Sequence, residues 1–92
     1  MDIGSTITTI RKNRGLSQKD LAKHIGISAN ALCAIEKDKS FPSKDTINAI
    51  CDVLHIPVGY LLFASLTDDD IPPQKLEVFK ALQEPMLKLF EI

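Results

Sequence analysis

Residues 18–37 read QKDLAKHIGISANALCAIEK and carry two helical patterns separated by a short break. Apolar side chains recur at helical spacing in both halves: Leu21, Ala22, Ile25, Leu32 and Ile35. Between them, Gly26 provides a helix stop and Ser28 a new N-cap, because glycine tolerates the left-handed conformation and a serine hydroxyl accepts a bond from a helix N–H. The stretch therefore predicts a helix-turn-helix, whose second helix can enter the major groove of DNA.

The rest of the chain extends this helical pattern and shows no strand pattern. The other predicted helices span 4–14, a segment that Ser43 caps, a segment with Pro57 in its first turn, and about 74–91. Pro85 predicts a kink or a restart in the last one, because proline removes a backbone N–H. The predicted fold is all-α, with a compact five-helix domain over 1–66, an acidic and proline-containing linker at 67–73 and a C-terminal amphipathic helix at 74–92.

The charges of the 92-residue chain are unevenly distributed. The net charge is −1, but residues 1–44 carry eight Lys or Arg against four acids, and residues 45–92 carry three lysines against eight acids. The first segment is thus +4 and the second −5. Ordinary variation of surface charge is one explanation. The alternative is DNA binding, since the positive half coincides with the helix-turn-helix.

Several other classes of protein do not fit the sequence. The longest apolar stretch, 58–66, is too short to span a bilayer, and the chain does not begin with a signal-peptide pattern. Cys33 and Cys51 form neither a disulfide framework nor a metal-ligand pattern, which indicates the reducing cytoplasm. Paired carboxylates, nucleophile elbows and phosphate loops are also missing from the pattern. We therefore expect no enzyme activity, no cofactor, no metal and no membrane partner.

Further anchors recur at fixed spacing around the central motif. They read IGxxIxxIR at 3–11, GLSQ at 15–18, SxxTI at 43–47 and LxIPxxxLL at 54–62. Through these anchors residues 3–66 resemble, without a gap, the Cro/repressor-type helix-turn-helix family, often called the XRE family. The resemblance implies a compact five-helix domain that binds an operator as a dimer.

The resemblance also implies a set of DNA-contacting residues. The base-reading positions are Ala29, Asn30, Cys33 and Ala34. Many family members carry Gln, Arg or Lys there, whereas here Asn30 is the one strong hydrogen-bonding side chain, and asparagine pairs well with adenine. Specificity is therefore expected to be modest, A·T-leaning or dependent on DNA shape. The expected phosphate contacts are Gln18, Ser28, Lys37, Lys39 and Ser40, with Lys44 as a weaker candidate.

Two further residues match a structural ion pair of the family. Arg11 and Glu36 would tie the first helix to the end of the third, an architectural role rather than a DNA contact. Cys33 has two interpretations: a small helix residue, or a redox switch in which oxidation of a thiol on the groove face blocks binding.

The sequence thus predicts a DNA-binding transcriptional regulator, of repressor type, that binds a near-palindromic operator as a homodimer. Its two recognition helices would lie about 34–36 Å apart. The first alternative is an antitoxin that binds a toxin through its tail and its own promoter through the helix-turn-helix. The second is an interaction module that has lost DNA binding. The last helix either forms the dimer interface or folds back on its own domain.

Overall fold

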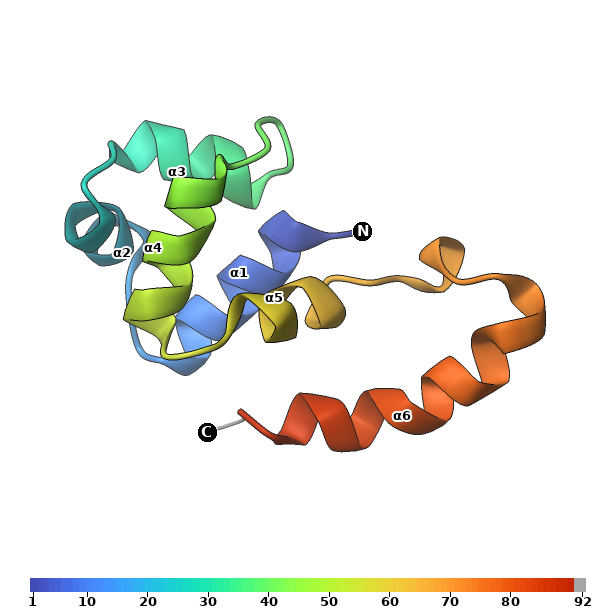
Figure 1. The fold of residues 1–92 in the computed structure, drawn as a ribbon. Helices are drawn as coiled ribbons and strands as arrows, with labels where there is room; N and C mark the ends of the chain where they lie inside the picture. Colours follow the sequence, from blue (N-terminus) through green and yellow to red (C-terminus); the bar gives the residue numbers. More distant parts are fainter. Residues whose placement is uncertain (91–92) are drawn as a thin grey trace.

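The computed structural model describes residues 1–90, and its regular structure is helical throughout this range, which confirms the all-α prediction. The elements are α1 (Ile3–Asn13), α2 (Gln18–Ile25), α3 (Ala29–Glu36), α4 (Lys44–Leu54), α5 (Val58–Ala64), the short 3-10 helices η1 (Asp68–Asp70) and η2 (Pro73–Lys75), and α6 (Leu76–Lys88). Helices α1 to α5 form one body, and α6 runs back below α5 after an extended connection (Figure 1).

Serine caps start three of the helices. The hydroxyl oxygens of Ser17, Ser28 and Ser43 each accept a bond from the backbone N–H three residues later, at 3.0, 3.0 and 3.2 Å. Gly26 ends α2 at φ +75°, a left-handed conformation that glycine adopts without steric cost. The N–H of Ile27 then returns to the Ala22 carbonyl at 3.1 Å. The chain therefore turns from α2 into α3 within three residues, which produces the predicted helix-turn-helix.

One apolar core joins α1 to α5. Its fully buried large side chains are Ile7, Leu21, Leu32, Ile50, Leu54 and Leu61. Cys51 belongs to this core at 2% exposure. Burial, together with the charge of Asp52, raises the pKa of the Cys51 thiol to about 11, so this cysteine is a neutral packing residue.

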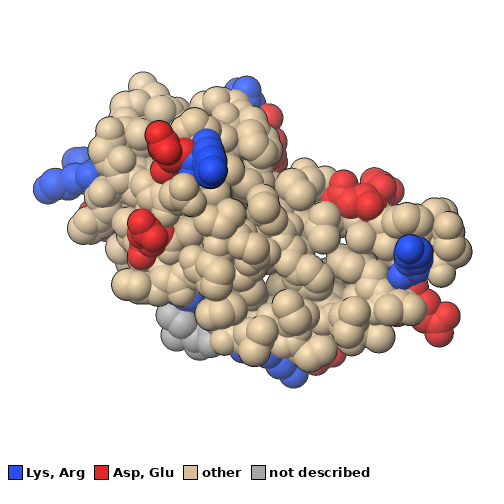
Figure 2. All heavy atoms as spheres, viewed as in Figure 1, with Lys and Arg blue, Asp and Glu red and all other residues tan. Residues whose placement is uncertain are grey.

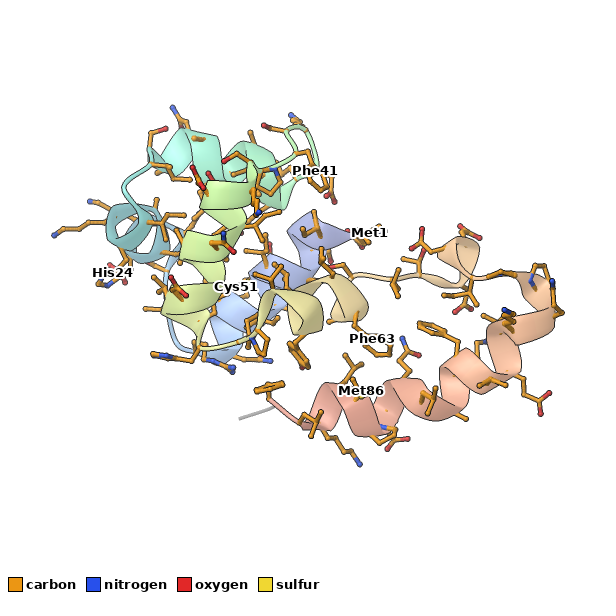
Figure 3. All side chains as sticks on the ribbon, viewed as in Figure 1. Met1, His24, Phe41, Cys51, Phe63 and Met86 are labelled. Atoms are coloured by element: carbon orange, nitrogen blue, oxygen red, sulfur yellow. The ribbon has the colours of Figure 1, made fainter. Side chains whose placement is uncertain are left out.

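Helix α6 folds back on the domain through aromatic contacts. Phe79 is buried, and its ring centroid lies 5.7 Å from that of Phe63, which points from α5 toward α6 (Figure 3). The Tyr60 hydroxyl donates to the Leu87 carbonyl at 2.8 Å, and the Tyr60 ring meets Phe90 edge-on at 5.0 Å. These contacts involve side chains of α5 that do not belong to the buried five-helix core.

Arg14 forms a second link between the tail and the domain. Its Nη2 donates to the Phe90 carbonyl at 3.1 Å, while its Nε donates to the Leu54 carbonyl at 2.9 Å. The guanidinium group thus connects the ends of α1, α4 and α6. Of the two arrangements predicted for the last helix, the structure contains the folded-back one.

The connection and the last helix differ in detail from the prediction. Residues 67–73 include a capped turn, in which the Thr67 N–H and hydroxyl both donate to the Asp70 carboxylate at 2.8 and 3.1 Å. The α-helix begins at Leu76 rather than at residue 74, because Pro73 starts a 3-10 turn. Helix α6 continues through Pro85 without a restart, since proline removes a single hydrogen bond there. The predicted end at Glu91 lies outside the described residues.

Candidate nucleic-acid interface

Helix α3 buries one face and presents the other to solvent. Leu32, Ile35 and Glu36 are buried against the domain. Ala29 and Asn30 are exposed at the start of the helix. The other two base-reading candidates, Cys33 and Ala34, are half-buried on α3. The four residues expected to face bases thus all retain exposed surface on one helix at the edge of the body (Figure 1).

Two of the expected phosphate contacts lie at helix starts. The Ser28 oxygen caps α3 by accepting the Ala31 N–H at 3.0 Å, so its hydroxyl hydrogen remains able to donate. Gln18 opens α2, and its Nε2 donates to Glu36 at 3.2 Å. An amide nitrogen carries two hydrogens, and the first N–H groups of a helix have no carbonyl of a preceding turn. Gln18 therefore has donors left for an anion, although its side chain also belongs to the buried network.

The other three expected phosphate contacts, Lys37, Lys39 and Ser40, lie in an exposed loop at the far end of α3. The N–H groups of Lys39 and Ser40 both return to the Ala34 carbonyl, at 2.9 and 3.3 Å, so the loop folds tightly onto the helix end. Phe41, which follows, is 70% exposed and is labelled in Figure 3. Lys44, the weaker candidate, is exposed at the start of α4.

Arg11 and Glu36 form a buried, two-pronged ion pair. Arg11 Nε lies 2.9 Å from Glu36 Oε2, and Arg11 Nη2 donates to Oε1 at 3.0 Å. A third guanidinium nitrogen donates to the Leu16 carbonyl at 2.9 Å. Burial by itself would raise the pKa of Glu36, but hydrogen bonds from Arg11, Thr8 and Gln18 and the Arg11 charge hold it below its ordinary value. The pair therefore joins α1, α2 and α3.

Part of this network was not predicted from the sequence. The Thr8 hydroxyl donates to Glu36 Oε1 at 2.9 Å, and the Gly4 N–H donates to the Asp38 carboxylate at 3.1 Å. A Cβ on Gly4 would lie 2.6 Å from the Glu36 carbonyl oxygen and closer still to that of Ile35. Gly4 thus lets α1 touch the backbone at the end of α3. A glycine inside a helical pattern was the available signal, since it often has a packing reason.

Charges of both signs are distributed along the molecule. In Figure 2 basic side chains project at the helix-turn-helix end and also along α6, while carboxylates gather over η1. Carboxylates also lie on α4 in this view (Figure 2). The carboxylates over η1 lie at the end of the molecule away from α3, so they repel a phosphate backbone bound at α3 only weakly (Figures 1 and 2).

The described part of the chain contains neither a metal-binding cluster nor a single membrane-spanning helix. Among residues 1–90, no group of three or more His, Cys, Asp or Glu is placed to hold a metal ion. In the same range no single helix is long and apolar enough to cross a membrane. Helices α4 and α5 reach that length and composition only when taken together, and they are bent by 96°.

Sequence comparisons with known proteins also support a DNA-binding role. A helix-turn-helix domain family matches residues 4–64. The chain is 29% identical over 82 residues to the cryptic phage CTXphi transcriptional repressor RstR of Vibrio cholerae, covering 88% of this chain and 74% of that protein. It is 37% identical over 62 residues to the immunity repressor protein of Bacillus phage phi105, covering 67% of this chain and 43% of that protein.

A third relative is the uncharacterised HTH-type transcriptional regulator YazB of Bacillus subtilis strain 168. The identity is 35% over 72 residues, covering 78% of this chain and 91% of that protein. No solved structure matches the chain significantly.

The exposed face of α3, the capped turn before it and the basic loop after it define a DNA-binding protein of the helix-turn-helix class. The family match covers most of the chain and spans α1 to α5. The chain belongs to the helix-turn-helix family, of the Cro/repressor type, and is a DNA-binding transcriptional regulator. Proteins of this family are regulators of transcription rather than enzymes.

Proposed function

We propose that this regulator is a repressor that binds a near-palindromic operator as a homodimer, with α3 of each copy in the major groove. The observation that carries the proposal is the exposed face of α3, which the buried Arg11–Glu36 pair holds in place. Two of the relatives are named as repressors, which favours repression over activation. A repressor of this kind acts on DNA in the bacterial cytoplasm.

The proposed contacts divide into two kinds. Asn30 reads adenine by hydrogen bonds, and the remaining base-facing residues, Ala29, Cys33 and Ala34, contact apolar groups such as thymine methyls. The phosphate contacts come from Gln18, Ser28, Lys37, Lys39 and Ser40, on both sides of the recognition helix. With one strong base-reading side chain per copy, specificity depends on combining two half-sites and on DNA shape.

The test is selection of fragments of the source genome by the purified protein at about 0.15 M salt, where non-specific attraction is weak. We expect enrichment of a near-palindrome, whose position identifies the regulated genes. A reporter placed behind the enriched site should lose expression when the protein is present. Binding that is equal for all fragments would contradict sequence-specific recognition, and increased reporter expression would contradict repression.

A further inference from the structure

Helix α6 carries a second apolar face that its own domain does not cover. We define the outer stripe as Val78, Leu82, Pro85 and Leu89. Its large members Val78, Leu82 and Leu89 are 62, 55 and 64% exposed. The spacing of four, three and four residues from 78 to 82, 85 and 89 makes a seam along one side of the helix. An apolar seam of this kind is typical of a helix that packs against another helix.

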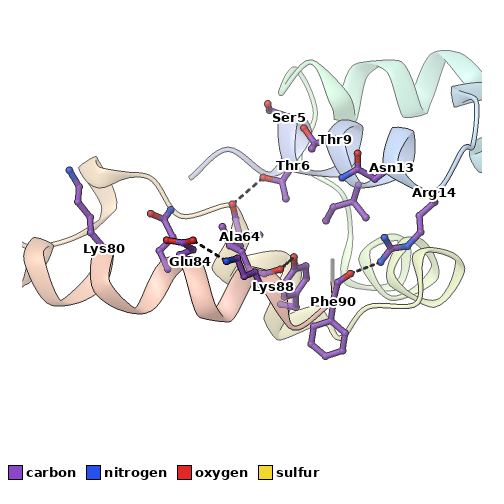
Figure 4. A pocket seen from close by; sticks show the side chains of 14 residues that line it. Ser5, Thr6, Thr9, Asn13, Arg14, Ala64, Lys80, Glu84, Lys88 and Phe90 are labelled. Atoms are coloured by element: carbon purple, nitrogen blue, oxygen red, sulfur yellow. Dashed lines mark hydrogen bonds and ion pairs between the residues drawn. The ribbon is translucent and has the colours of Figure 1, made fainter. Parts of the chain in front are cut away.

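The inner side of α6 is different in character. There a groove of about 640 Å³ opens between α6 and α1 (Figure 4). Polar side chains line it on both walls, including Thr9 and Asn13 of α1 and Lys80 and Glu84 of α6. The Tyr60–Phe90 pair, one of the aromatic contacts that hold α6, lines this groove. The outer stripe is therefore a separate surface, and a helix in the groove would not cover it.

We propose that the outer stripe pairs with the same stripe of a second copy of this chain, with the two α6 helices antiparallel. The charges along one edge of the stripe select this arrangement. Glu77 and Lys88 lie eleven residues apart, which is about three helical turns, so they share an edge at opposite ends of the helix. Antiparallel pairing sets Glu77 beside Lys88 of the partner subunit. Parallel pairing instead sets each edge of the stripe against the other edge of the partner's stripe, so the two charges do not meet.

An antiparallel pair is related by a twofold axis, so the contact closes after two copies and does not propagate into a fibre. This is the symmetry that a near-palindromic site requires. The inference thus deepens the proposed function by naming the surface of the dimer, and only its DNA-binding consequence rests on that function.

The size of the stripe sets the strength of the pair. Helix α6 has 13 residues, a length of about 20 Å, and its exposed apolar side chains supply roughly half of the about 800 Å² per partner that stable interfaces bury. The dimer in solution is therefore weak, with a Kd in the micromolar range or above. Two half-sites on one DNA molecule bring the copies together and complete the association.

Sedimentation equilibrium of the full chain without DNA tests the pairing. The wild type should show a reversible monomer–dimer equilibrium, and Leu82→Glu should raise the dimer Kd at least tenfold. Lys80→Gln is the matched control, because it changes the net charge by the same single unit at an exposed position of α6 outside the stripe. Circular dichroism verifies that each variant is folded. A wild type that stays monomeric at millimolar concentration, or a Leu82→Glu variant that dimerises normally, overturns the proposal.

The orientation is tested by exchanging the edge charges. Glu77→Lys and Lys88→Glu should each weaken the dimer several-fold, and the double exchange should restore it. The single change at Lys88 also removes an exposed pair with Glu84 at 3.0 Å, a contact that contributes little to stability. A double exchange that is weaker than both single changes contradicts the antiparallel order.

Binding to DNA separates this inference from the proposed function. Leu82→Glu should weaken binding to a selected two-half-site fragment at least tenfold and leave binding to a single half-site unchanged. Equal loss on both fragments overturns the assignment of the stripe to the dimer. If no fragment is selected by any variant, the proposed function fails while the sedimentation result still decides the pairing.

Discussion

At the scale of single residues, the candidate interface depends on a buried carboxylate. The Glu36 side chain is only 4% exposed and accepts bonds from Arg11, Thr8 and Gln18, which come from two other helices. No described buried side-chain nitrogen or oxygen lacks a partner. Removing one member of a buried ion pair leaves the other charge buried without a partner, and this strongly destabilises the fold. Glu36 thus couples the stability of the domain to the position of α3.

The pH dependence of stability follows from Glu36. Its pKa in the folded protein lies below the ordinary value of 4.5, so the stabilisation is complete above that value and is lost as the pH falls through the folded pKa. Urea unfolding of wild type and Glu36→Gln, followed from pH 7 to pH 2.5, should show a steeper acid-side decline for the wild type. At pH 7 we expect the variant to be about 3 kcal/mol less stable. Parallel pH profiles for the two proteins would remove this role.

Asn30 and Lys39 should differ in how their loss spreads over DNA sequences. Asn30→Ala should cost about 1–3 kcal/mol at one base position, because it removes a paired contact to one base. Lys39→Ala should weaken binding to every sequence. It should also reduce the slope of log K against log salt concentration by about one unit, because one phosphate contact is lost. Titrations against a set of singly substituted operators at two salt concentrations distinguish the two. A uniform loss for Asn30→Ala would show that this side chain does not read a base.

At the scale of elements, helix α3 is positioned by a close backbone contact as well as by the ion pair. Gly4 sits inside α1 where it touches the carbonyl groups at the end of α3, and its N–H binds Asp38. Asp38 itself has a left-handed backbone, at φ +58°, which turns the chain sharply after α3. The contact lets α1 act as a platform that fixes the end of the recognition helix next to the basic loop.

A methyl group at Gly4 should disrupt this contact. Gly4→Ala should lower the free energy of unfolding by about 1–3 kcal/mol, because the neighbouring atoms are backbone and cannot move aside easily. Gly59→Ala is the matched control: Gly59 also lies inside a helix, but a Cβ there meets nothing within 4 Å. It should stabilise the protein by about 0.5–1 kcal/mol. Similar losses for the two variants in thermal and urea unfolding would refute the close-contact explanation.

At the scale of the whole molecule, the chain is a five-helix body with a tail helix attached by a few contacts. Phe79 packs near Phe63, and Tyr60 and Arg14 hold the far end of the tail. The groove beside α6 shows that the tail covers α1 incompletely. Such an attachment opens more easily than the core, since local stability follows the amount of buried contact.

Shortening the Phe79 side chain should therefore detach α6 without unfolding the five-helix body. In Phe79→Ala, hydrogen exchange of α6 amides should accelerate at least tenfold, while amides of α1 to α4 should keep their protection. The same variant should weaken the dimer, because the proposed pairing surface lies on α6. Equal acceleration in all helices would mean that the tail and the body unfold as one unit.

The positions and starts of the helices could be read from the sequence because their causes are local. A serine cap, a glycine with positive φ and an apolar repeat act over a few residues, so Ser28, Gly26 and the Leu32 pattern placed α3 to within one residue. The all-α class and the helix-turn-helix followed from these signals. The pairing of Arg11 with Glu36 came from the family resemblance, since residues 25 positions apart have no local signal.

Contacts between distant segments, by contrast, arise only when the chain packs. Three contacts join segments that are separated in sequence. Gly4 approaches the end of α3, the Gln18 side chain donates a hydrogen bond to Glu36, and α6 docks on the domain. The apolar pattern of residues 74–91 contains two faces, and periodicity alone does not assign one to the core and the other to solvent. Local sequence thus establishes which segments are helical, because capping and periodicity are short-range. The packed structure decided which surfaces those helices expose, because burial depends on the whole arrangement of the chain.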